Sequence, residues 1–236
     1  MIARIFIILV VLAATVAAIF AQLDQQARLS PTYAALVPAS LSGNAARERS
    51  KIALLLGDGA RAQEEAVAQI ALRPMPAESL SVLALGALQA GDSDTARTAL
   101  RAASQRGWRD PVSQLASGQS ALEQGEYTIV AQRINALLAT GELREPAILL
   151  LADLIKSSEG REAFADRLAS SGRWQSDVLG RAYDAVTPAY WARTIALAQS
   201  KGAAFDCARL ESLSDRYRRD GHDEELALFQ SANCAD

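Results

Sequence analysis

Residue types that carry chemistry are scarce in this chain of 236 residues. Histidine occurs once, as His222, and cysteine twice, as Cys207 and Cys234. These are too few ligands for the usual kind of zinc site and leave little scope for histidine-dependent catalysis, so we expect neither a metal nor a cofactor. His222 stands in the charged sequence RDGHDEE, which favours an exposed turn. The 24 basic and 27 acidic residues give a formal net charge of −3, which offers no basic surface to nucleic acid.

Glycine (14 residues), proline (7 residues) and aromatic residues (6%) are sparse as well, whereas 50% of the residues are hydrophobic. The low glycine and proline contents exclude collagen-like and low-complexity chains. The apolar fraction argues against global disorder, because burial of that surface can offset the entropy lost on ordering. At about 150 residues per domain, the length indicates one folded domain with additional segments.

Long hydrophobic runs are absent except at the N-terminus, where residues 5–21 carry no charge. Extended to residues 2–23, the run measures about 33 Å as a helix, enough for a hydrocarbon core of about 30 Å. A membrane anchor is therefore predicted over residues 1–23. A cleaved signal peptide is the alternative, although cleavage after Ala21 would put Ile19 at a position that favours small residues. Because Arg4 is the only charge before the run, we expect a single pass through the inner membrane, with the N-terminus in the cytoplasm and the remainder periplasmic or otherwise extracytoplasmic.

The two cysteines suit an exported domain, where a small, even number of them favours a disulfide. They enclose a segment predicted as a helix up to about Asp220, a turn at Gly221 and a second helix from about Asp223. Antiparallel packing of these helices would bring Cys207 and Cys234 together, and closing this loop of roughly 28 residues would stabilise the fold by about 3 kcal/mol. Two unpaired, buried cysteines are the alternative.

The remaining chain is predicted to be all-α after a short connecting segment. Residues 24–43 contain prolines, serines and a glycine between short apolar patches, and are predicted to form a spacer. From residue 44 onward, Ala, Leu, Arg, Glu and Gln dominate in helix-length blocks. Gly57, Gly91 and Gly125, each followed by an acidic residue, recur at intervals of 34 residues. Each unit is therefore predicted to be a helix, a tight turn formed by the glycine and the acidic residue, and a second helix.

This pattern resembles the tetratricopeptide repeat family, whose unit is 34 residues long with small residues where helices cross. With the turn glycines at the family's glycine position, the crossing positions hold Ser50, Ala84 and Gly118 in the first helices, Ala62, Ala96 and the larger Val130 early in the second helices, and Ala66, Leu100 and Ile134 further along. The family's aromatic residue in the first helix is missing. The resemblance covers three units over residues 44–145. It implies a right-handed α-solenoid of stacked antiparallel helix pairs behind one transmembrane helix, with divergent repeats, the first with its turn at Gly160, and a C-terminal cap over residues 146–236.

In the resembling family, the first helices of the repeats line a concave face that binds ligands. At those positions this chain carries Arg47, Lys51, Glu78, Ser81, Leu85, Gln119 and Glu123, which the resemblance implies as partner-binding residues. The family's set that clamps the C-terminal carboxylate of a peptide is not reproduced, because Val82, Val112 and Ala116 occupy key positions. Capture of a peptide C-terminus is therefore not expected.

Other residues with possible chemistry have simpler explanations. Asp92 and Asp94 lie at a helix start, where a carboxylate suits the positive end of the helix dipole. Trp108, Trp174 and Trp191 lie at repeat boundaries or helix starts, where packing between helix pairs is favoured over contact with a partner.

The predicted function is therefore that of a membrane-anchored, envelope-exposed scaffold that binds another protein, because repeat arrays leave a long surface for partners. The resemblance is compatible with envelope assembly, secretion and polysaccharide export. An enzyme acting on envelope glycan, or an accessory domain of one, is the alternative, with Glu78 as its acid. A structural tether that acts through its membrane span, residues 2–23, is a third hypothesis. The partner and the oligomeric state stay open.

Overall fold

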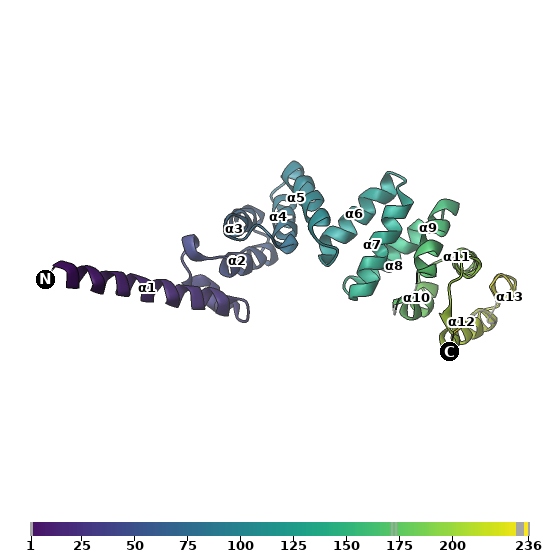
Figure 1. Cartoon of the computed structure of the whole chain (residues 1–236). Helices are drawn as coiled ribbons and strands as arrows, with labels where there is room; N and C mark the ends of the chain where they lie inside the picture. Colours follow the sequence, from purple (N-terminus) through teal and green to yellow (C-terminus); the bar gives the residue numbers. More distant parts are fainter. Residues whose placement is uncertain (1, 171, 173, 230–233, 236) are drawn as a thin grey trace. The chain divides into compact units, whose positions relative to one another are not determined.

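The computed structural model describes residues 2–170, 172, 174–229 and 234–235. These residues are almost entirely α-helical, with one long apolar helix at the N-terminus (Figure 1). The all-α class expected from the sequence is confirmed. Residue contacts divide the chain into two compact units, Met1–Asp110 and Pro111–Asp236.

The first unit contains the apolar helix α1, two short 3₁₀ helices and four further α-helices. Their bounds are α1 Ile2–Ala27, η1 Pro31–Leu36, η2 Ala39–Leu41, α2 Asn44–Leu55, α3 Gly59–Leu72, α4 Ala77–Gln89 and α5 Ser93–Arg106. Helix α2 packs on α3, α3 on α4 and α4 on α5, and α2 also contacts α4. Within this unit, successive helices therefore pack on one another in chain order.

Helix α1 has the length and hydropathy of a membrane span. It is 26 residues long, its most apolar window has a mean hydropathy of 2.7, and none of that window is buried. Phe6, Ile8 and Leu12 are 66%, 65% and 60% exposed. Apolar surface on this scale is normally covered by lipid or by another protein. Helix α1 is therefore a candidate membrane span or signal anchor.

The second unit contains eight α-helices and one pair of short parallel strands among its described residues. The bounds are α6 Pro111–Glu123, α7 Tyr127–Thr140, α8 Arg144–Leu154, α9 Ser158–Ala169, α10 Trp174–Tyr183, α11 Pro188–Ser200, β1 Phe205–Asp206, α12 Cys207–Arg219, α13 Asp223–Leu226 and β2 Cys234–Ala235. Helix α6 packs on α7, α7 on α8 and α9, and α9 on α11. The boundary expected at residues 145 and 146 falls in the first turn of α8.

The turns after α2, α4 and α6 share one geometry. Gly57, Gly91 and Gly125 have φ angles of 78°, 83° and 73°, in the left-handed region that favours glycine. In each turn the glycine N–H donates to the carbonyl three residues back, and the next N–H donates to the carbonyl five residues back. This is the Schellman motif. Asp58 and Asp92 then cap α3 and α5, each accepting a backbone N–H at 3.1 Å from the residue three positions later.

Gly160 does not form the turn expected from the 35-residue spacing after Gly125. It lies in the first turn of α9, where the Ser157 hydroxyl accepts its N–H at 3.0 Å. A Cβ at this position would lie 1.9 Å from the carbonyl oxygen of Leu154, so only glycine fits here. The residue therefore permits a close approach between the end of α8 and the start of α9.

Small side chains build the core of the first unit. Ala62, Ala66, Ala84 and Ala96 are fully buried. A Cβ on Gly86 would lie 2.8 Å from a backbone nitrogen of α3. The backbones of α3 and α4 therefore pack closely, and there is little room for larger residues at these crossings.

Larger side chains fill the second unit. Trp191 is fully buried and Trp174 is 8% exposed, and their rings lie 6.3 Å and 6.0 Å from the ring of Phe164. Both tryptophans therefore contribute to packing. Trp108, in the first unit, is instead 53% exposed, with the guanidinium of Arg109 5.1 Å from its ring centre.

The segment of residues 24–43, expected as a spacer, packs against the helices beside it. Ala34 of η1 and Val37 are buried and form a small apolar cluster with Ala27 and Ala45, against which Leu23 is partly buried. Helix η1 contacts both α1 and α2. The end of the apolar helix is thereby part of the folded unit.

Candidate functional site

Charged residues of α2 and α4 form a chain of ion pairs. Arg47 Nη1 lies 3.5 Å from Glu78 Oε2, and Arg47 Nε lies 3.2 Å from Glu48 Oε1. Lys51 Nζ lies 3.2 Å from the same oxygen of Glu48. Three residues assigned to partner binding by the sequence, Arg47, Lys51 and Glu78, are therefore brought together, with Glu48 between them.

Leu85 adds an apolar side chain to this surface. It follows Glu78 by seven residues on α4, which places both on one face of the helix, and it is 37% exposed. We call the surface of Arg47, Lys51, Glu78 and Leu85 the α2–α4 face.

The ion pairs of the α2–α4 face have two largely covered members, Arg47 and Glu48, whose side chains are 20% and 13% exposed, and two exposed members. The side chains of Lys51 and Glu78 are 47% and 64% exposed. Exposed ion pairs contribute only about 0–1 kcal/mol, because solvent screens them and the side chains lose freedom. Charges from a partner can therefore reach Lys51 and Glu78 more readily than Arg47 and Glu48.

Ser81 does not belong to the exposed surface. It is 3% exposed, and its hydroxyl donates to a carboxylate oxygen of Asp110, itself 5% exposed. The serine is therefore used inside the unit, where it fixes α4 to the segment after α5. The resemblance to the repeat family implied a partner-binding residue here, and the sequence gives no local sign of a buried acidic partner 29 residues away.

Gln119 and Glu123 lie on α6, in the second unit. Both are exposed, and their spacing of four residues places them on one face of that helix. They form a separate candidate contact surface from the α2–α4 face.

Sequence reasoning missed a buried carboxylate at the end of α1. Asp24 is 8% exposed. Its carboxylate accepts hydrogen bonds of 2.8–3.1 Å from the backbone N–H groups of Asn44 and Ala45 and from the side-chain amide of Asn44. It therefore caps the N-terminus of α2, where N–H groups lack partners within the helix and the dipole favours a negative charge. Arg73, directly after α3, donates to the side-chain oxygen of Asn44. We call this arrangement the Asp24 junction.

Arg49 of α2 also contacts the segment of residues 24–43. Its Nη1 donates to the carbonyl oxygens of Ala34 and Val37 at 2.8 Å and 3.3 Å, and its Nη2 donates to the Ser42 hydroxyl at 2.9 Å. Its Nε lies 2.7 Å from Glu65 Oε1 on α3. One side chain therefore ties the 24–43 segment to α2 and α3. Nothing in the sequence indicated these contacts of Arg49, because an arginine within a helix is normally solvated.

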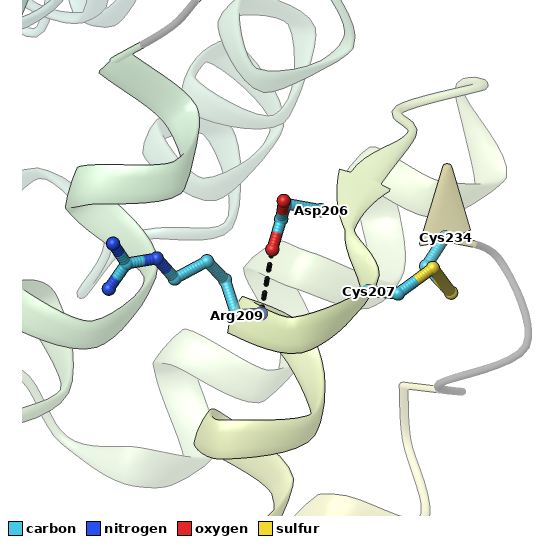
Figure 2. Close-up of a disulfide and its surroundings, with 4 residues drawn as sticks. All are labelled: Asp206, Cys207, Arg209 and Cys234. Atoms are coloured by element: carbon cyan, nitrogen blue, oxygen red, sulfur yellow. Dashed lines mark hydrogen bonds between the residues drawn. A yellow bond between two sulfur atoms is a disulfide. The ribbon is translucent and has the colours of Figure 1, made fainter. Parts of the chain in front are cut away.

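The expected disulfide between Cys207 and Cys234 is present, with the two Cα atoms 4.9 Å apart. It joins the first turn of α12 to β2, whose Cys234 pairs in register with Phe205 of β1. Figure 2 shows the Asp206 carboxylate accepting the backbone N–H of Arg209, at 2.9 Å, while the Arg209 guanidinium points away from the disulfide. The second helix of this hairpin begins at residue 223 as expected but ends at residue 226.

Tyr183 of α10 and Tyr217 of α12 pack against each other. The rings of Tyr183 and Tyr217 lie 4.8 Å apart, and the Tyr183 hydroxyl donates to Asp220 at 2.7 Å. Burial, followed by the hydrogen bond to Asp220, raises the pKa of Tyr183 to about 12. Burial also raises the pKa of Tyr217, and the neighbouring Tyr183 adds to that rise. Both hydroxyls are therefore held neutral as parts of the core.

In the part of the chain that the structure describes, no three histidine, cysteine, aspartate or glutamate side chains are grouped to hold a metal ion. His222 lies just before α13, with Nδ1 3.8 Å from Glu225 Oε2, and its side chain is 37% exposed. Glu78, the acid of the glycan hypothesis, is paired with Arg47. The α2–α4 face combines the exposed charges of Lys51 and Glu78 with the partly exposed apolar side chain of Leu85. Comparisons with protein-family models, curated proteins and solved structures find no match for this chain.

Proposed function

We propose that this protein is a membrane-anchored scaffold whose stacked helices bind another protein outside the cytoplasm. The observation that carries the proposal is the direct connection of an uncovered 26-residue apolar helix, through Asp24, to helices that pack in chain order. Stacked helix pairs bury their core between neighbours and leave an extended surface for partners.

We infer that the helices form a right-handed α-solenoid of tetratricopeptide-like pairs. Equal spacing and equal Schellman geometry at Gly57, Gly91 and Gly125 support this inference. The burial of small residues at the crossing positions, such as Ala62 and Ala84, supports it as well.

We infer that α1 anchors the protein in the inner membrane, with the N-terminus in the cytoplasm and the helical units outside. The single positive charge before the apolar run, Arg4, supports this orientation. The Cys207–Cys234 disulfide supports an oxidising compartment for the second unit.

The α2–α4 face is the proposed binding surface of the first unit, with Gln119 and Glu123 as contacts on α6. A partner segment would exchange its charges with Arg47, Lys51 and Glu78. Leu85 would give it an apolar contact.

Site-specific photo-crosslinking in native membranes tests this function. A photoreactive residue at Lys51 or Leu85 should give an adduct with the same partner protein, and Arg47→Glu should reduce both adducts because the partner then meets a reversed charge. Arg97 on α5, whose side chain is 67% exposed, is the control position. It should not give that adduct.

The assignment of the α2–α4 face as the binding surface fails in two cases. Adducts of equal yield at Lys51, Leu85 and Arg97 would indicate random collision. No adduct at Lys51 or Leu85, in membranes where the protein is abundant, would exclude the α2–α4 face as a binding surface.

A further inference from the structure

A groove of about 410 Å³ lies between α10 and α12 in the second unit. Among the described residues of its lining, the charged ones are Asp177, Arg181 and Asp184 on α10 and Arg209 and Arg216 on α12. Spacings of four, three and seven residues place each set on one face of its helix. Figure 2 shows that the Arg209 guanidinium extends from α12 on the side away from the disulfide. We call this surface the α10–α12 groove.

Arg216 is already used by contacts within the fold. Its Nη1 donates to the carbonyl oxygen of Gly180 at 3.0 Å, and its Nη2 forms an ion pair with Asp184. Its guanidinium carbon also lies 4.5 Å from the centre of the Tyr183 ring. Arg216 therefore joins α12 to α10 and balances the charge of Asp184.

Arg181 and Arg209 have no comparable contacts. Both are exposed at the groove, and neither forms an ion pair with a carboxylate among the described residues. The hydroxyl of Ser212, which also lines the groove, forms no hydrogen bond with another described residue. An arginine offers five N–H donors in a planar fork that fits a carboxylate or a phosphate. The groove therefore presents two arginines and a hydroxyl whose acceptors do not come from the described part of the chain.

The backbone of α10 is open at this groove. Gly180 lies inside the helix, where glycine is less favourable than alanine. A Cβ at this position would meet no atom within 4 Å, so neither packing nor the contact from Arg216 requires a glycine. Leu213 of α12 also lines the groove and is 1% exposed. The missing side chain at Gly180 leaves room for the backbone of a bound molecule to approach α10.

The length and the charge of the groove suit a short peptide. Residues 177–184 and residues 209–216 each rise about 10 Å along their helix, which is the length of about three extended residues. Three arginines and two aspartates give the described lining a net charge of +1. A polyanion would meet the two aspartates as like charges, whereas a single carboxylate is matched by Arg181 and Arg209.

We propose that the α10–α12 groove binds a short acidic segment of a protein partner, with an aspartate or glutamate carboxylate held by Arg181 and Arg209. The carboxylate accepts N–H groups from both guanidinium groups, and such charge-assisted hydrogen bonds are stronger than neutral ones. The backbone of the segment passes over Gly180, and the Ser212 hydroxyl donates to one of its carbonyl groups. That the carboxylate belongs to a protein rests on the proposed scaffold function. The site itself does not involve the α2–α4 face.

Selection from a library of random dodecapeptides displayed on phage tests the proposal. The target is the full-length protein in detergent micelles without reductant, so that the Cys207–Cys234 disulfide stays closed. Selected peptides are synthesised with a fluorophore, and their Kd is measured by fluorescence anisotropy for the wild type and for two variants. One variant combines Arg181→Gln with Arg209→Gln. The matched control is Arg193→Gln, because Arg193 is exposed on α11 outside the groove and forms no ion pair with another described residue.

We expect the selected peptides to share an acidic residue. The double variant should raise their Kd about 10- to 100-fold, because charge-assisted hydrogen bonds to the carboxylate are lost. Replacing the acidic residue of the peptide by its amide should cause a similar loss. Arg193→Gln should leave Kd unchanged, and the melting temperature of the double variant should equal that of the wild type because its two arginines have no ion pair among the described residues.

The proposal is overturned if the selected peptides share no acidic residue, if the double variant and the Arg193→Gln control have equal Kd values, or if no peptide that depends on the two arginines is selected. Binding of an alginate oligosaccharide instead of peptides, lost in the double variant, would assign the groove to a polyanionic glycan and would overturn it as well. Partner adducts at Lys51 and Leu85 are measured independently in native membranes. The proposed function and this inference can therefore fail separately.

Discussion

Replacing Asp24 tests whether the end of the apolar helix belongs to the folded unit. Asp24→Ala removes both carboxylate oxygens from the Asp24 junction. The backbone N–H groups of Asn44 and Ala45 then lose their acceptor, and these two residues are 3% and 0% exposed. A lost N-cap costs about 0.5–2 kcal/mol, and each buried, unsatisfied donor about 1–3 kcal/mol. Since these terms overlap, we expect a loss of about 2–4 kcal/mol.

For a unit of this size, that loss corresponds to a fall in melting temperature of about 8–16 °C. Circular dichroism of the full-length protein in detergent micelles measures it, because α1 stays helical in the micelle and the transition reports the other helices. Limited proteolysis gives a local measure, since cleavage within residues 28–43 should become faster. Asp94→Ala is the matched control, because the Asp94 side chain is 92% exposed at the start of α5. Equal melting and equal proteolysis for the two variants would refute the structural role of Asp24.

Three further predictions concern the turns and the second unit. Cys207→Ser should leave one free thiol and lower stability by about 2–4 kcal/mol; two titrating thiols in the denatured, non-reduced wild-type protein would contradict the disulfide. Gly91→Ala should cost about 1–2 kcal/mol because φ is 83° there, whereas Gly180→Ala, inside α10 with open space around it, should be neutral or stabilising in the same denaturation assay. The pKa of Tyr183 is raised from 10 to about 12, first by burial and then by its bond to Asp220, so the stability that it contributes should be complete below pH 10 and lost as pH rises toward 12. Tyr183→Phe should flatten that part of the stability profile, and an unchanged profile would show that other groups cause it.

The helical turns were predictable because their chemistry is local. A Schellman turn requires a residue with positive φ, and glycine followed by aspartate identifies both the end of one helix and the cap of the next. Gly57 and Gly91 therefore predicted their turns well. Gly160 did not, because a glycine needed for close packing looks the same in sequence as a glycine needed for a turn.

The buried polar pairs were not predictable because their partners are distant in the chain. Asp24 meets Asn44 across 20 residues, and Ser81 meets Asp110 across 29. Each of these residues, taken with its neighbours alone, suggests a solvated side chain. The same limit applies to the 24–43 segment, whose prolines and serines indicated a spacer although Ala34 and other small residues pack it onto α2.

The overlap between α1 and the folded unit also determines how the chain can be shortened. Leu23, Asp24 and Ala27 belong both to the apolar helix and to the packing of the first unit. A soluble fragment that starts near residue 22 would keep the cap of α2, whereas one that starts at Asn44 would lose the cap together with the contacts of Arg49 to the preceding segment. The last turn of α1 should therefore be kept in a shortened form of this protein, because it holds the cap of α2.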